Sequence, residues 1–181
     1  MVIHACAFVA YENEDPGGFS RVNVTGSLDG GATWSTPIRV NDGSDDVEAL
    51  QPRVEVAPSG TVAVVFYERR LACPADPVSG VQFDPLAPAG KRNVCVNAAI
   101  QFYAPALTLL GHNIRLSRFT WDPQLNAPKR TCVCGSSTFL GDYFGLDFGG
   151  GYAYTSSVST YDYGNNPSFY QQQIVARVAL P

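Results

Sequence analysis

Short stretches with the pattern of β-strands recur along this chain, with turn-forming residues between them. One unit runs from Gln51 to Phe119, where an alternating run, a Pro-Ser-Gly turn and a run of β-branched and aromatic residues follow one another. A second unit, from Asp142 to Val178, has three glycines at its turn. Four-stranded units repeated along a chain are typical of β-propellers. We therefore expect an all-β fold, with the stretch before Val40 as the last three strands of an earlier unit.

Composition also favours strands over helices. The chain has 17 Gly and 13 Pro in 181 residues, and 12% of its residues are aromatic. Only Ala98–Leu110 reads as a helix, and Pro105 would break it. We expect one partial domain over residues 1–181, with a cysteine-bracketed insertion at 71–112.

The segment Ser27-Leu28-Asp29-Gly30-Gly31-Ala32-Thr33-Trp34 has the chemistry of a rigid turn. Asp29 accepts hydrogen bonds from backbone N–H groups further along, and Thr33 ties its hydroxyl back. Gly31 tolerates a positive φ. Trp34 is expected to serve as an apolar plug. These properties predict a hairpin between two strands of one sheet.

This segment matches the Asp-box, Ser-x-Asp-x-Gly-x-Thr-Trp, and so resembles the sialidase-like (BNR-repeat) β-propellers. The stretches GGATWSTPIRVND, QPRVEVAPSGTVAVVFYERR and FLGDYFGLDFGGGYAY are also similar to secreted bacterial and fungal members of that group. The resemblance implies a six-bladed propeller of which this chain supplies about two and a half to three four-stranded blades. It implies that the remaining blades are missing here.

Blade topology separates the Asp-box from a substrate site. The turns between strands 1 and 2 and between strands 3 and 4 share one face, and the resemblance implies that substrate binds on the other. Ser27, Asp29, Gly31, Thr33 and Trp34 are therefore expected to be structural.

Sialidase chemistry needs arginines for the sugar carboxylate, a tyrosine nucleophile with an activating glutamate, and an aspartate for proton transfer. The resemblance assigns the sugar carboxylate to Arg53, Arg69 and Arg70, and the nucleophile to Tyr143 or Tyr161. It assigns the activation of the nucleophile to Glu68 and the proton transfer to Asp142. The alternative is structural: an ion pair between Glu68 and Arg69, with Tyr143 in the core and Asp142 capping a turn.

Two functions follow from this resemblance. The first is a sialidase-like exo-hydrolase acting on terminal sialic acid or similar acidic sugars, and the alternative is a non-catalytic secreted propeller that binds glycans or proteins. A purely structural repeat module is a third. The Arg-Ile-Pro motif of sialidases is absent.

The acidic loop after Val40 is a weak candidate for calcium, through Asp42, Asp45 and Asp46, because it lacks EF-hand spacing; a solvated turn is the favoured interpretation. No other cofactor is expected. The net charge of −4 gives no reason to expect nucleic acid, and no apolar run is long enough to span a membrane.

The five cysteines lack the spacing of a zinc site. Cys73 and Cys95 bracket a Pro- and Gly-rich loop, so a disulfide between them is expected, with buried thiols as the alternative. The pairing of Cys6, Cys132 and Cys134 stays open. A secreted location is expected, supported by the sequon at Asn23, although no signal peptide is visible.

Overall fold

The computed structural model describes residues 6–71, 95–121, 129–132, 135–138, 144–159 and 172–181, and structural statements below concern these residues. Within them the chain is all-β, with three antiparallel sheets of three or four strands and a separate two-stranded hairpin. The described part contains no helix, and hence none long and apolar enough to cross a membrane.

The first sheet has the order β1 (Ala7–Glu14), β2 (Ser20–Ser27), β3 (Ile38–Arg39). The middle sheet has the order β4 (Ala49–Val56), β5 (Val62–Glu68), β6 (Asn97–Tyr103), β7 (Leu109–Arg115). The last sheet has the order β10 (Gly145–Gly149), β11 (Tyr152–Ser159), β12 (Gln172–Ala179). The separate hairpin joins β8 (Lys129–Cys132) to β9 (Gly135–Thr138).

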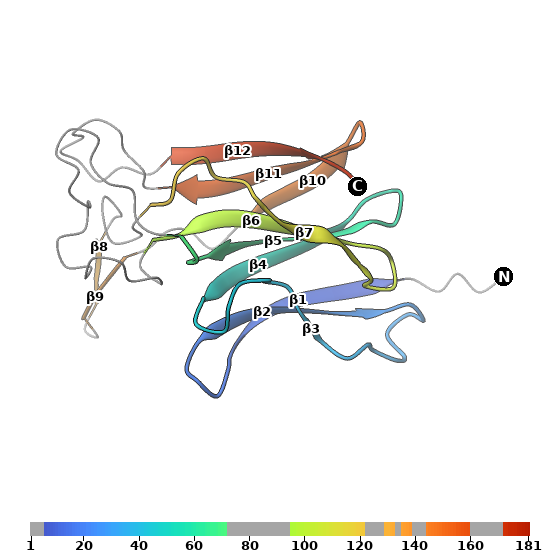
Figure 1. The fold of residues 1–181 in the computed structure, drawn as a ribbon, viewed down its shortest axis with the longest axis horizontal. Helices are drawn as coiled ribbons and strands as arrows, with labels where there is room; N and C mark the ends of the chain where they lie inside the picture. The colour runs from blue at the N-terminus through green and yellow to red at the C-terminus, as the bar shows by residue number, and fades with distance from the viewer. Residues whose placement is uncertain (1–5, 72–94, 122–128, 133–134, 139–143, 160–171) are drawn as a thin grey trace.

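The middle sheet lies between the other two sheets (Figure 1). Every residue of β5 and of β6 is buried, because each strand has a neighbour on either side and a sheet over each face. One apolar cluster, which includes Val22, Val64 and Tyr103, joins the first and middle sheets. Another, which includes Ile100, Trp121 and Leu146, joins the middle and last sheets. These two cores hold the three sheets as layers.

The strand prediction is largely confirmed. In the unit expected from Asp142 to Val178, strand β11 follows the three-glycine turn, and the stretch before Val40 does form three strands. The helix expected at Ala98–Leu110 is wrong, because residues 97–103 form β6 and Pro105 lies in the turn that follows. A strand buried on both faces loses the polar–apolar alternation that would identify it, so its apolar run is ambiguous.

The expected insertion at 71–112 is too long for the same reason. Strand β6, the turn after it and the start of β7 occupy residues 97–112, so the stretch between β5 and β6 is shorter, and its residues 72–94 lie outside the described part. Cys95 is buried and disulfide-bonded. Its expected partner, Cys73, lies outside the described residues, so that pairing stays a prediction. Cys6 is a free, exposed thiol.

Turns gather at two ends of the stacked sheets. Figure 1 shows the β2–β3, β4–β5, β6–β7 and β10–β11 turns at the end near the N-terminus; we call this the hairpin end. The β1–β2 turn, the end of β5 and the start of β4 lie at the opposite end, which we call the rim. The link, defined as residues 40–48, runs from β3 to β4 and reaches the rim. Adjacent turns of an up-and-down sheet alternate between ends in this way.

Candidate functional site

The turn at residues 27–34 lies at the hairpin end and is held by a set of local hydrogen bonds; we call it the Asp-box turn after the motif that its sequence resembles. Asp29 accepts from the backbone N–H of Thr33 at 2.9 Å and from the hydroxyl of Thr33 at 2.6 Å. The hydroxyl of Ser27 donates to Asp29 at 2.7 Å and accepts from the N–H of Gly31 at 2.8 Å. At the base of the turn, the N–H of Ser35 donates to the carbonyl of Gly26 at 2.8 Å. The residues expected to be structural are therefore hydrogen-bonded to one another within the turn.

Backbone geometry requires glycine here. Gly30 and Gly31 have φ values of 77° and 92°, which residues with a Cβ adopt only with strain. The plug expected at Trp34 is not found, because the indole is 47% exposed and packs on its own turn, with Nε1 donating to the carbonyl of Gly31 at 3.2 Å. The indole therefore contributes to the turn itself.

The hydrogen bonds of the turn also favour the ionised form of Asp29. Hydrogen bonds from the hydroxyl and N–H of Thr33, and then from Ser27, lower the pKa of Asp29 to about 2. An aspartate that stays ionised and has its lone pairs engaged is a poor general acid. The carboxylate therefore serves the turn.

The rim holds a charged cluster around the end of β5, which we call the rim cluster: Asp42, Glu68, Arg70, Asn97 and Asn113. Glu68 is only 2% exposed; its Oε2 lies 2.6 Å from Nη2 of Arg70, and its Oε1 accepts from the Asn97 amide at 3.1 Å. Arg70 also contacts Oδ1 of Asp42 at 2.6 Å. One guanidinium thus bridges a buried carboxylate of the middle sheet and a carboxylate of the link.

Asn113 of β7 completes this connection. Its N–H donates to Asp42 Oδ2 at 3.1 Å, and its Oδ1 accepts from the Asp42 N–H at 2.8 Å and from Arg70 at 3.1 Å. Its amide nitrogen donates to Gln101 at 2.6 Å. Burial raises the pKa of Asp42, but the hydrogen bonds from Arg70 and from the Asn113 N–H outweigh it, and the net shift is downward. The carboxylate of Asp42 is therefore held as an anion by its neighbours.

Sequence reasoning missed the asparagines of the rim cluster. Asn97 and Gln101 are polar residues inside a run that is otherwise apolar, and a polar side chain on a buried strand needs a partner. That signal was available, although it does not say which partner.

Each of the three arginines expected to bind a carboxylate has a different protein partner. Arg69 pairs with Glu48 of the link at 2.8 Å, and its N–H donates to the Glu48 carbonyl at 3.0 Å. Arg53 lies 3.7 Å from Glu55 and donates to the carbonyl of Phe144 at 3.3 Å. Arg70 belongs to the rim cluster. The expected ion pair between Glu68 and Arg69 is thus wrong in its partner, since Glu68 pairs with Arg70.

Two arginines of the first sheet hold the link from its other side. Arg21 is 5% exposed and donates to the Val47 carbonyl at 2.6 Å, to the Asp45 carbonyl and to Asp15 at 2.8 Å. Arg39 donates to Asp45 at 2.6 Å and to the Gly43 carbonyl at 2.9 Å. The link is therefore clasped by Arg21 and Arg39 on one side and by Arg69 and Arg70 on the other.

The calcium candidates lie in the link, and their carboxylates face cations or hydroxyls of the protein. Asp42 pairs with Arg70, Asp45 pairs with Arg39, and Asp46 accepts from Ser44. The part of the chain that the structure describes contains no group of three or more acidic, histidine or cysteine side chains that could hold a metal ion. The three carboxylates therefore contact different protein groups along the link.

Two buried tyrosines stand near the site. The Tyr67 hydroxyl donates to the Val158 carbonyl at 3.0 Å and accepts from its N–H at 2.9 Å, which joins β5 to β11. Burial raises the pKa of Tyr67 to about 12. Burial and then the charge of Asp42 raise the pKa of Tyr103 as well. Both are neutral structural groups at ordinary pH.

The remaining candidates, Asp142, Tyr143 and Tyr161, lie outside the described residues. Among the described ones, the structure brings Glu68 and Arg70 together and sends Arg53 and Arg69 to separate carboxylates. No family model, no curated protein and no solved structure matches this chain.

Proposed function

We propose that this chain is part of a sialidase-type propeller that hydrolyses glycans ending in sialic acid or a similar acidic sugar. The observation that carries the proposal is the charge at the rim, where Glu68, Arg69 and Arg70 follow one another at the end of β5. This end lies opposite the Asp-box turn (Figure 1). Arginines at such a rim are the groups that bind and orient a substrate carboxylate, because the guanidinium can hold both oxygens at once.

Within this proposal, Arg69 is the arginine that would bind the substrate carboxylate. Its side chain is 28% exposed and contacts Glu48, while Arg70, equally exposed, contacts two carboxylates and Asn113. A sugar carboxylate would displace or share the contact with Glu48. Arg70 would then position Glu68 and the link.

Release of a fluorescent dye from a sialic acid glycoside by the full-length protein tests the proposal. We expect Arg69→Ala to lower kcat/KM by about a hundredfold, the loss typical of a charged contact to a reacting group. Arg115→Ala, an exposed arginine of β7, is the matched control and should leave kcat/KM unchanged. A wild-type protein with no turnover, or equal losses in both variants, would contradict hydrolysis at this site.

A non-catalytic glycan- or protein-binding propeller is the second candidate. The observation that favours it is that Arg53, Arg69 and Arg70 all face protein carboxylates, which lowers their attraction for a further anion. Retention of the full-length protein on a glycan array without release of dye would support this function over hydrolysis. Retention lost in Arg69→Ala would place the binding at the rim.

A further inference from the structure

The first strand of the middle sheet contains a residue in a strained backbone conformation. Gln51 lies within β4 and has a φ of 50°, in the left-handed region that residues with a Cβ rarely adopt. The next residue is Pro52, whose ring favours an extended conformation of the residue before it. Leu107 also has a positive φ, but it lies in the turn between β6 and β7, where hairpins often use one. Gln51 is therefore held against its own preference by its surroundings.

The strain lies at a β-bulge. From Leu50 to Arg53, β4 advances by three residues while β5 advances by two, from Tyr67 to Val65, so β4 carries one extra residue. Because side chains alternate along a strand, this extra residue turns Arg53 to the opposite face of the sheet from the one it would otherwise occupy. Arg53 thus lies on the same face as Tyr67 and Val65, which belong to the apolar cluster that joins the middle and last sheets.

Arg53 reaches the last sheet from this position. Its Nη1 donates to the carbonyl of Phe144, directly before β10, at 3.3 Å. Its Nη2 lies 3.7 Å from Glu55, and the two side chains are 45% and 43% exposed, so this ion pair contributes little. Arg69 and Arg70 are less exposed, at 28% each. Among the described residues, Arg53 makes a single hydrogen bond, which leaves donors of its guanidinium for a further anion.

The bulge is also bonded to the first sheet. Glu12 of β1 accepts from the backbone N–H of Gln51 at 3.0 Å through Oε2 and from the hydroxyl of Ser20 at 2.9 Å through Oε1. The strained conformation therefore depends on the packing of the first and middle sheets. A purely structural explanation of the bulge is that it serves to join these two sheets.

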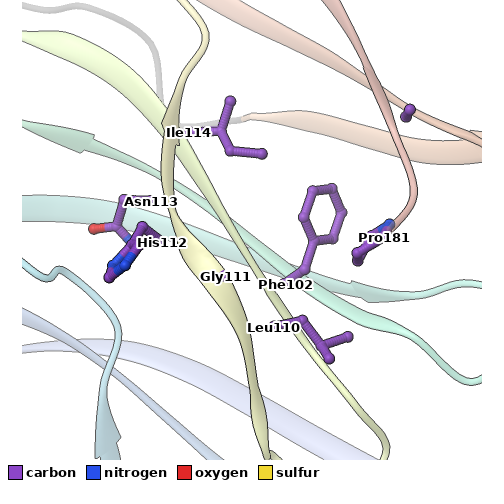
Figure 2. A pocket seen from close by; sticks show the side chains of 8 residues that line it. Phe102, Leu110, Gly111, His112, Asn113, Ile114 and Pro181 are labelled. Carbon is purple, nitrogen blue, oxygen red and sulfur yellow. The ribbon is translucent and has the colours of Figure 1, made fainter.

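The opposite edge of the middle sheet has a different character. An apolar groove of about 430 Å³ lies there, over β7 and beside the end of β12 (Figure 2). Phe102 and Leu110 contribute to its lining, and its one amide side chain, Asn113, is already bonded to the link through Val40. This lining does not suit a charged sugar, whereas the β4 edge presents an exposed arginine.

We propose that Gln51 is a positioning residue for the proposed substrate site. Its bulge turns Arg53 toward the last sheet, where the guanidinium binds the acidic sugar through charge-assisted hydrogen bonds. Gln51 itself acts through Arg53 and does not contact the sugar. Strain of this kind persists where the geometry that it holds is used. The inference rests on the proposed function and adds to it the backbone feature that directs one of the arginines.

Steady-state kinetics of dye release by the full-length protein test the inference. Arg53→Ala should raise KM about tenfold with a smaller change in kcat, because a charged contact to the bound sugar is lost. Gln51→Val should raise KM by a similar factor, since a β-branched residue resists a positive φ and so disfavours the bulge. The double variant should raise KM no further, because both changes act through the same guanidinium. Gln51→Gly, which accepts a positive φ, should leave KM unchanged.

Urea unfolding keeps the test valid if Gln51→Val does not fold. Gln51→Gly should have a higher midpoint than its matched control Gln51→Ala, because both lose the side chain and keep the N–H that bonds to Glu12, but only glycine relieves the strain. Equal midpoints would overturn the inference whatever the protein hydrolyses.

The kinetic results separate the inference from the proposed function. If the wild type releases dye but Arg53→Ala leaves KM unchanged, or if Gln51→Val raises KM further in the Arg53→Ala background, the bulge is only structural and hydrolysis stands. If the wild type releases no dye, the same variants are compared by their Kd for a sialylated glycan, with the same order expected. A wild type that neither hydrolyses nor binds the glycan would overturn both the inference and the proposed function.

Discussion

The Asp-box turn and the link flank the same short strand, β3, and both are rich in polar residues, yet they are held in different ways. The side-chain bonds of the turn join residues two to four positions apart. The bonds of the link reach 26 positions to Arg21, 28 to Arg70 and 71 to Asn113. The turn is therefore a property of its own eight residues, whereas the link exists only when the first and middle sheets are packed together. Substitutions in the two segments should differ accordingly.

Arg70→Ala should give the largest effect. It leaves Glu68 buried without its cation and releases Asp42, and removal of one partner of a buried ion pair costs about 3–5 kcal/mol. Urea unfolding followed by circular dichroism measures the loss. The double variant Arg70→Ala/Glu68→Gln should recover part of it, because the buried negative charge is then gone. No recovery would mean that the contact with Asp42 carries the stability.

Arg21→Ala should come next, at about 2–3 kcal/mol, since it removes buried donors from the carbonyls of Val47 and Asp45. We expect the link to loosen, so hydrogen exchange at residues 42–48 should rise more than exchange at the Asp-box turn. Arg21→Lys should restore little, because an ammonium cannot reach both carbonyls and Asp15 with a fixed fork of donors. Equal exchange rates in the two segments would contradict the distinction between them.

Protonation of Asp29 should have a smaller effect that stays within the turn. Because its folded pKa is depressed to about 2, the carboxylate stabilises the turn fully above the unfolded pKa of about 4, and this contribution is lost as the pH falls through about 2. The indole N–H resonance of Trp34, which reports the bond to Gly31, should shift over that range in wild type. In Asp29→Asn this pH-dependent shift should be absent. A shift that persists in Asp29→Asn would assign the titration to another group.

The difference between local and long-range bonds also explains how much of this structure could be predicted from the sequence. Ser27, Asp29 and Thr33 could be assigned to a turn because their partners lie within the motif. The strands could be placed wherever alternation survives, and β6 was misread because burial on both faces removes it. The partner of Arg69 could not be assigned, because Glu48 is 21 positions away and meets it only once β4 pairs with β5. The sequence also did not indicate that Glu68 pairs with Arg70 and not with its direct neighbour Arg69.

Trp34→Phe should have the smallest effect, although the side chain is large. Trp34 is 47% exposed and makes one hydrogen bond, to the carbonyl of its own turn, so we expect a loss within about 0.5 kcal/mol. Trp121→Phe is the matched control: Trp121 is 2% exposed and packs edge-on against Tyr67 at 5.5 Å, so the same change should cost about 2 kcal/mol. Thermal unfolding of both variants measures the difference. If Trp34→Phe cost as much as Trp121→Phe, the indole would be buried in solution, and the turn would depend on tertiary packing as the link does.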